Sequence, residues 1–216
     1  DAAGDQALVV RHIAPGMGEV APQHFLGVVE IIFPVFHFLC GDRERQRPVL
    51  VLGDSISAGY GLPPHQAWPA LLAEKTGWRI ANGSVSGDKA ADALARLPGL
   101  LEVHAPKLVL IQLGGNDMLR RVPEAKTRTD LMRAVSLAQA RGAVTILVAT
   151  PRPSVAGAVF QRLSAAPFYA ELAKDAKTDL IEDAIAEVLS NPELKLDALH
   201  PNAASTRYVR ASHEKV

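Results

Sequence analysis

From Pro48 onward, short apolar runs alternate with amphipathic or Ala-rich stretches, and this alternation constrains the fold more than any other feature of the chain. The strand-like runs are 48–52, 78–82, 107–113, 143–149 and a weaker one at 178–181. The helix-like stretches are 66–76, 88–102, 125–141, 160–175, 182–190 and 202–214. Nearly continuous apolar strands that alternate with helices are typical of a parallel sheet covered on both faces. The sequence therefore predicts an α/β fold.

Composition limits the classes of partner and cofactor. The chain has 216 residues, 48% of them hydrophobic, which suffices for one domain with a sizeable core, or for one such domain plus an appendage. Its 23 basic and 23 acidic residues give a net charge of +0, so there is no electrostatic reason to expect a nucleic-acid partner. The single cysteine, Cys40, excludes an intramolecular disulfide and a Cys-rich zinc site. His12, His24 and His37 have no carboxylate at metal-ligand spacing, so we expect no metal.

The N-terminal part differs from the rest. We expect an appendage, residues 1–47, before a main domain, residues 48–216. The apolar run Phe25–Cys40 is shorter than the roughly 20 residues that span a bilayer, and Glu30 and Pro34 interrupt it. So many apolar side chains need a protein surface to cover them. We therefore expect packing on the chain's own domain or on a second copy, giving a homo-oligomer, without stable membrane insertion.

Polar residues follow the predicted strands at the points where ligands bind in α/β sheets. Gly53-Asp54-Ser55 closes the first strand, and Gly87 lies in the loop after the second. Asn116 follows the third strand, and Asp197 and His200 share a loop before the last helix. Since the carboxyl ends of parallel strands meet at one edge, the sequence predicts that these residues gather there.

This set of residue types suits acyl transfer. A serine hydroxyl becomes a nucleophile when a base takes its proton, and a third group orients the base. Ser55 is the candidate nucleophile, His200 the base, and Asp197 the group that orients the imidazole. The backbone N–H groups of Ser55 and Gly87 and the side-chain amide of Asn116 are the candidate oxyanion donors.

Neighbouring residues have structural interpretations. We expect Asp54 and Asp88 to cap the helices that follow them, and Asp117 to brace the Asn116 loop by hydrogen bonds. The serines of these segments other than Ser55 are predicted to be turn hydroxyls. The candidates for lining an acyl pocket are Leu62, Met118 and Phe160.

Several segments, taken in order, resemble the SGNH (GDSL-type) hydrolase superfamily, and most closely its bacterial thioesterase I/lysophospholipase/arylesterase branch. They read GDSISAGYGL, NGSVSGD, ARLPGLL, LGGND and DALHPN, and the resemblance covers residues 48–214. The four residues that name the superfamily correspond to Ser55, Gly87, Asn116 and His200.

The resemblance implies a flavodoxin-like, three-layer α/β/α domain with a parallel five-stranded sheet of order 2-1-3-4-5. It also implies hydrolysis of esters or thioesters without a metal or other cofactor. Ala198 and Met118 stand where relatives often carry glycine, and Met118 bears on acyl-chain preference. Periplasmic, secreted and cytoplasmic locations all remain open.

The sequence thus predicts a serine esterase acting on a small-molecule ester. Aryl esters, short-chain acyl esters, acyl thioesters and lysophospholipids are not distinguished. An α/β-hydrolase would show Gly-x-Ser-x-Gly, which no serine here has. Gly59-Tyr60-Gly61 lacks the third glycine of a dinucleotide-binding loop, because position 64 is proline. The alternative from another class is a non-catalytic flavodoxin-like domain that binds a small molecule.

Overall fold

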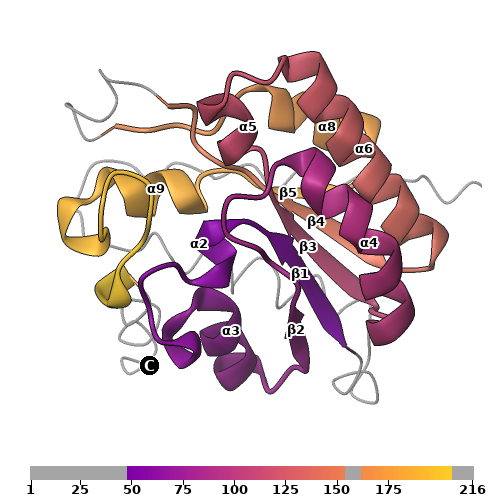
Figure 1. Cartoon of the computed structure of the whole chain (residues 1–216), viewed down its shortest axis with the longest axis horizontal. Helices are drawn as coiled ribbons and strands as arrows, with labels where there is room; N and C mark the ends of the chain where they lie inside the picture. Colours follow the sequence, from indigo (N-terminus) through magenta and orange to yellow (C-terminus); the bar gives the residue numbers. More distant parts are fainter. Residues whose placement is uncertain (1–47, 154–161, 206–216) are drawn as a thin grey trace, which may run out of the picture.

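The chain forms a five-stranded parallel sheet of order β2-β1-β3-β4-β5 with helices on both faces (Figure 1). The computed structural model describes residues 48–153 and 162–205. The strands are β1 (Val49–Gly53), β2 (Ile80–Asn82), β3 (Leu108–Gln112), β4 (Val144–Val148) and β5 (Asp179–Ile181). The helices are α2 (Ser55–Ala58), α3 (Trp68–Thr76), α4 (Ala90–His104), α5 (Gly115–Leu119), α6 (Glu124–Ala140), α8 (Phe168–Asp175) and α9 (Ala184–Ser190). Two 3₁₀ turns, η2 (Pro64–Gln66) and η3 (Pro192–Leu194), lie in the connections between these elements. The predicted fold class and strand order are confirmed.

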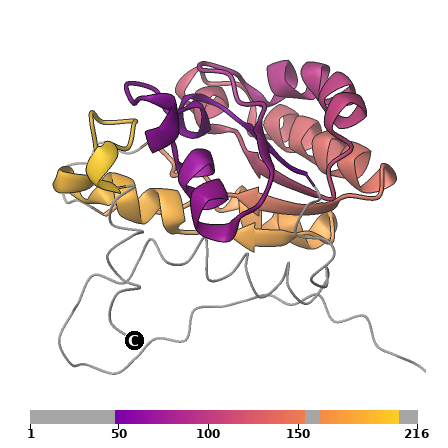
Figure 2. The same ribbon diagram turned by 90° about the horizontal axis from the view of Figure 1, so that it is seen from below.

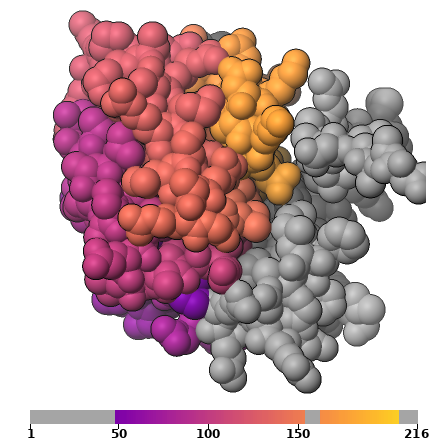
Figure 3. Space-filling view, turned by 90° about the vertical axis from the view of Figure 1, so that its right-hand side faces the viewer, coloured from indigo at the N-terminus to yellow at the C-terminus, as the bar shows by residue number. Residues whose placement is uncertain are grey.

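Each face of the sheet has its own hydrophobic core. Successive side chains of a strand point to opposite faces, so Leu50 and Leu52 join one core while Val49 and Val51 join the other. The first core packs against α4, α6 and α8, and the second against α2, α3 and α9. Figure 3 shows α4 and α6 side by side on the outer surface over the first core. This burial on both faces explains why the strands read as continuous apolar runs.

The strand order reverses at β1, which pairs with β2 on one side and β3 on the other. The β1–β3 register ends at Gly53 opposite Gln112, so the segments after both strands leave the sheet at the same edge. In open α/β sheets, ligands bind outside this switch point. The segment after α9 also lies there, beside α2, in both views (Figure 1, Figure 2).

One predicted helix begins later than its pattern indicates. The stretch 160–175 contains α8 only from Phe168, while residues 162–167 are not helical. Pro167 is the N-cap residue, Ala165 forms an antiparallel bridge with Pro151, and Ala166 N–H donates to the carbonyl of Thr150 over 3.2 Å. Pairing with the segment after β4 therefore replaces the first turns of the expected helix.

Some expectations lie outside the described residues. These are the appendage 1–47 with its apolar run, Phe160, and positions 206–214 of the last expected helix. Of the expected helix 202–214, residues 203–205 are described, and they are helical. Within residues 48–153 and 162–205, no helix combines the length and the hydropathy that crossing a membrane requires.

Candidate active site

The turn after β1 presents Ser55 at the start of α2. Asp54 is the N-cap residue: its Oδ1 accepts a hydrogen bond from Ile56 N–H over 3.1 Å, which confirms the predicted cap. Ser55 is the first helical residue, and N–H groups in a first turn have no partner within their helix. A Cβ at Gly53 would lie 2.7 Å from Ser57 Cβ, so the tight turn requires glycine there.

Ser57, two residues after the candidate nucleophile, has a structural role. Its hydroxyl donates to Gln112 Oε1 over 2.6 Å and accepts from Trp68 Nε1 over 3.1 Å. The side chain is completely buried, so it links α2 to β3 and α3. It is therefore a buried link between elements, whereas the sequence suggested a turn hydroxyl.

The loop after η3 brings Asp197 and His200 to Ser55. His200 Nε2 lies 3.0 Å from Ser55 Oγ, and His200 Nδ1 lies 2.9 Å from Asp197 Oδ2. A carboxylate only accepts hydrogen bonds, so the proton belongs on Nδ1 and Nε2 is left to accept from the serine hydroxyl. The three residues that the sequence singled out for acyl transfer thus form one hydrogen-bonded chain.

This loop is closed on itself. Lys195 and Pro201 form an antiparallel bridge, and Leu196 N–H donates to the His200 carbonyl over 2.8 Å. Asp197 Oδ1 accepts from the N–H groups of Leu199 and His200 over 2.7 and 2.9 Å. Partial burial raises the pKa of the Asp197 carboxyl, but the hydrogen bonds from His200 and Leu199 outweigh it, and the net pKa is lowered. Asp197 therefore stays ionised beside the imidazole.

The Asn116 amide lies against the turn that carries Ser55. Asn116 is the second residue of α5, and its Nδ2 is 3.4 Å from Asp54 Oδ2. A Cβ at Gly115 would be 2.9 Å from Thr150 Cγ2, so glycine lets α5 start this close to the neighbouring loop. Burial raises the pKa of the Asp54 carboxyl to about 6, and the hydrogen bond from Ile56 N–H lowers it only in part.

Gly87 lies in the loop after β2, which is tied to the end of β1. Val85 N–H donates to the Gly53 carbonyl over 3.1 Å, and Asp88 N–H donates to the Val85 carbonyl over 3.2 Å. Gly87 has a φ of 85°, in the left-handed region that favours glycine. The loop therefore holds Gly87 at the edge where β1 ends.

The prediction that Asp88 caps α4 is wrong. Its carboxylate pairs with Arg96, whose Nη1 also donates to the Gly83 carbonyl over 2.9 Å. The N–H of Ala90, the first residue of α4, donates instead to Asp117 Oδ2 over 2.9 Å. Asp117 is almost completely buried and also accepts from Thr127 Oγ1 over 3.3 Å, so it ties α5 to α4 and α6.

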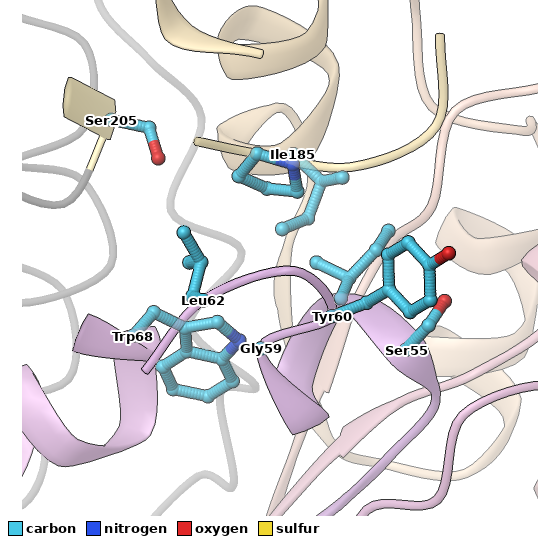
Figure 4. A pocket seen from close by; sticks show the side chains of 9 residues that line it. Ser55, Gly59, Tyr60, Leu62, Trp68, Ile185 and Ser205 are labelled. Carbon is cyan, nitrogen blue, oxygen red and sulfur yellow. The ribbon is translucent and has the colours of Figure 1, made fainter. Parts of the chain in front are cut away.

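An apolar recess opens beside Ser55 (Figure 4). Leu62, predicted to contact substrate, lines it together with Tyr60, Trp68 and Ile185, which the sequence did not single out for this role. Tyr60 and Ser55 lie next to each other in Figure 4. Met118 is half-buried and packs against the core under α4 and α6. In the described part of the chain, no three His, Cys, Asp or Glu side chains gather as metal ligands would.

Comparison of the sequence with known proteins points to the same family as the short motifs, and the matches extend over most of the predicted main domain. A model of the GDSL-like lipase/acylhydrolase family matches residues 51–207. An arylesterase of Vibrio mimicus is 34% identical over 181 residues, which cover 81% of this chain and 90% of that protein. Thioesterase 1/protease 1/lysophospholipase L1 of Escherichia coli (strain K12) is 36% identical over 166 residues, 74% of this chain and 78% of that protein.

Comparison with solved structures gives the same result. The crystal structure of TesA has a TM-score of 0.67 at 35% identity and covers 76% of this chain and 93% of that one. These matches confirm the resemblance that the ordered motifs indicated. The chain therefore belongs to the GDSL-like lipase/acylhydrolase family and is a hydrolase.

Proposed function

We propose that this hydrolase is a serine esterase that cleaves carboxylic esters through an acyl-enzyme on Ser55. The observation that carries the proposal is the continuous chain from Ser55 Oγ to His200 Nε2, 3.0 Å, and from His200 Nδ1 to Asp197 Oδ2, 2.9 Å. A nucleophile, a base and an orienting carboxylate at hydrogen-bond distance are the requirements of this chemistry.

In the proposed mechanism, Ser55 Oγ attacks the acyl carbonyl while His200 Nε2 takes the hydroxyl proton. The negative charge that develops on the carbonyl oxygen is held by the N–H groups of Ser55 and Gly87 and by the Asn116 amide. His200 then gives its proton to the leaving alcohol or thiol, and the acyl group remains on Ser55. Water, deprotonated by His200, repeats the attack and releases the acid.

Asp54 supports the proposed role of Asn116. An amide nitrogen carries two protons, and the contact with Asp54 Oδ2 uses one of them. The other is then available for the oxyanion, and the amide cannot turn over to present its oxygen instead. The ionised Asp197 supports the imidazolium that forms on His200 during each transfer.

The relatives and the recess both support the proposed substrate class. One relative is named an arylesterase and another a thioesterase and lysophospholipase. The side chains around the recess beside Ser55 are largely apolar, among them Leu62, Trp68 and Ile185. Both observations support esters with an apolar part, either an aryl leaving group or an acyl chain, as substrates. Rates across acyl chain lengths on one leaving group would rank these substrates.

The test uses a fluorophosphonate probe and an aryl acetate substrate. We expect Ser55→Ala to fold, to lose nearly all hydrolysis and to resist labelling by the probe. Ser86→Ala is the matched control, because Ser86 is exposed and lies in the neighbouring loop. It should keep both rate and labelling. Labelling that persists in Ser55→Ala would refute the assignment of the nucleophile, and a wild-type chain without hydrolysis would favour the binding-domain alternative.

A further inference from the structure

The ring of Tyr60 covers the imidazole of His200. The two ring centroids are 4.4 Å apart and the ring planes meet at 33°. Tyr60 is itself 53% exposed, so burial of its own surface does not account for its position. The His200 side chain, in contrast, is only 14% exposed. The mostly buried histidine therefore carries a half-exposed tyrosine ring against its own ring.

The backbone around Tyr60 is held in place on both sides. Tyr60 N–H donates to the Ser55 carbonyl over 3.0 Å, which ties the backbone of Tyr60 to the turn of the nucleophile. Gly59 and Gly61 have φ values of 77° and 74°, both in the left-handed region. A Cβ at Gly59 would lie 2.6 Å from Ala67 Cβ, so this glycine allows close packing on the segment before α3.

Gly61 makes the second contact with the loop of His200. A Cβ at Gly61 would overlap Leu196 Cδ2, so the backbone of Gly61 packs directly against Leu196. Leu196 immediately precedes Asp197 in the closed loop. The segment 59–61 thus contacts the histidine loop twice, once through a ring and once through a glycine.

We propose that Tyr60 is a positioning residue for His200. The Tyr60 ring fixes the plane of the His200 imidazole, and the π face of the Tyr60 ring stabilises the imidazolium form. The inference rests on the proposed function of His200 as the base. An aromatic face within about 6 Å of a cation attracts it. In the described part of the chain, the hydroxyl of Ser55 and the carboxylate of Asp197 contact His200 directly, and the carboxylate of Asp54 acts on it through its charge. Tyr60 acts in addition to them.

The test compares Tyr60→Phe with Tyr60→Leu. Phenylalanine keeps the π face, whereas leucine keeps apolar cover without it. We expect Tyr60→Phe to retain the kcat of the wild type, and Tyr60→Leu to lose about two- to fivefold in kcat with little change in KM. In Tyr60→Leu the acid limb of the pH–rate profile should move to lower pH, because the charged imidazole is less stabilised.

Two results would overturn the inference. One is a Tyr60→Leu enzyme with the kcat and pH profile of the wild type. The other is an equal loss in both variants, which would assign the effect to the hydroxyl. A half-exposed side chain tolerates both substitutions, and thermal midpoints check the folding of each variant. Ser55→Ala and His200→Ala are assayed in the same series. Full activity in either of these two variants would indicate that the proposed function is wrong, whereas loss of activity in both leaves a negative result at Tyr60 as a failure of this inference alone.

Discussion

Replacement of the buried carboxylate of Asp54 should make the fold more stable at neutral pH while impairing catalysis. Asp54 is 2% exposed, and its burial raises the pKa of the carboxyl from 3.8 to about 6. Its protonated form stabilises the fold below pH 4, and this contribution is lost as the pH rises through 6. Ionised Asp54 therefore costs about 3 kcal/mol at pH 8, from two pKa units at about 1.4 kcal/mol each.

Asp54→Asn keeps the shape of the side chain and its Oδ1 acceptor for Ile56 N–H. It removes the charge, so the cost of ionisation disappears. It also places an NH₂ group opposite Asn116 Nδ2, where Asp54 Oδ2 accepted a hydrogen bond. Two donors then face each other, the Asn116 amide turns over, and its oxygen replaces the proposed oxyanion donor. We expect kcat to fall on the order of 10²-fold.

The assay is urea unfolding of both proteins at pH 4 and pH 8. The stability gained by Asp54→Asn should be about 2 kcal/mol larger at pH 8 than at pH 4. The changed contact with the Asn116 amide is the same at both pH values, so it cancels in this difference. Asp179→Asn is a control, since burial also raises the pKa of Asp179, at the start of β5. It should show the same direction of change with an unaltered hydrolysis rate. A difference near zero for Asp54→Asn would refute the reasoning.

Two further predictions test the oxyanion donor and the backbone. Asn116→Ala should lower kcat by about 10²–10³-fold and leave KM nearly unchanged; an effect confined to KM in steady-state kinetics would mean that Asn116 binds the substrate uniformly. Gly99→Ala should stabilise the fold by about 0.5–1 kcal/mol in urea unfolding, since Gly99 lies inside α4 with nothing within 4 Å of a new Cβ. Gly77→Ala meets equally open space but at a φ of 69°, so it should destabilise; a stabilised Gly77→Ala would contradict the argument from φ.

The sheet could be predicted because its signal is local. The central strands β1, β3 and β4 are apolar runs with both faces buried almost throughout, so apolar runs separated by helices indicated a parallel sheet. The strand order came from family resemblance, since periodicity does not carry it. Ser55, Gly87 and Asn116 could be predicted to lie along one edge of the sheet, because each follows a strand that ends there. Asp197 and His200 lie further along the chain, and their place beside Ser55 depends on how the loop after α9 folds.

The sequence failed where a residue's partner is distant along the chain. Asp88 precedes α4 and has the pattern of a cap, but its carboxylate pairs with Arg96. The N–H of Ala90 is bound instead by Asp117, 27 residues further along the chain. The contact between Tyr60 and His200 has no signal in spacing, because it depends on two loops that meet only in the folded chain.

The closed loop 195–201 divides the site into two bodies of different local stability. One body consists of the turns after β1, β2 and β3, of which β1 and β3 are fully buried, and it holds Ser55 and the predicted oxyanion donors. The other is a short surface loop, in which Asp197 and His200 are bonded to each other and to the loop's own backbone. Opening of such a loop requires far less free energy than unfolding of a buried sheet. On heating, hydrolysis would therefore report the departure of this loop, with its two residues still mutually bonded, before the sheet melts.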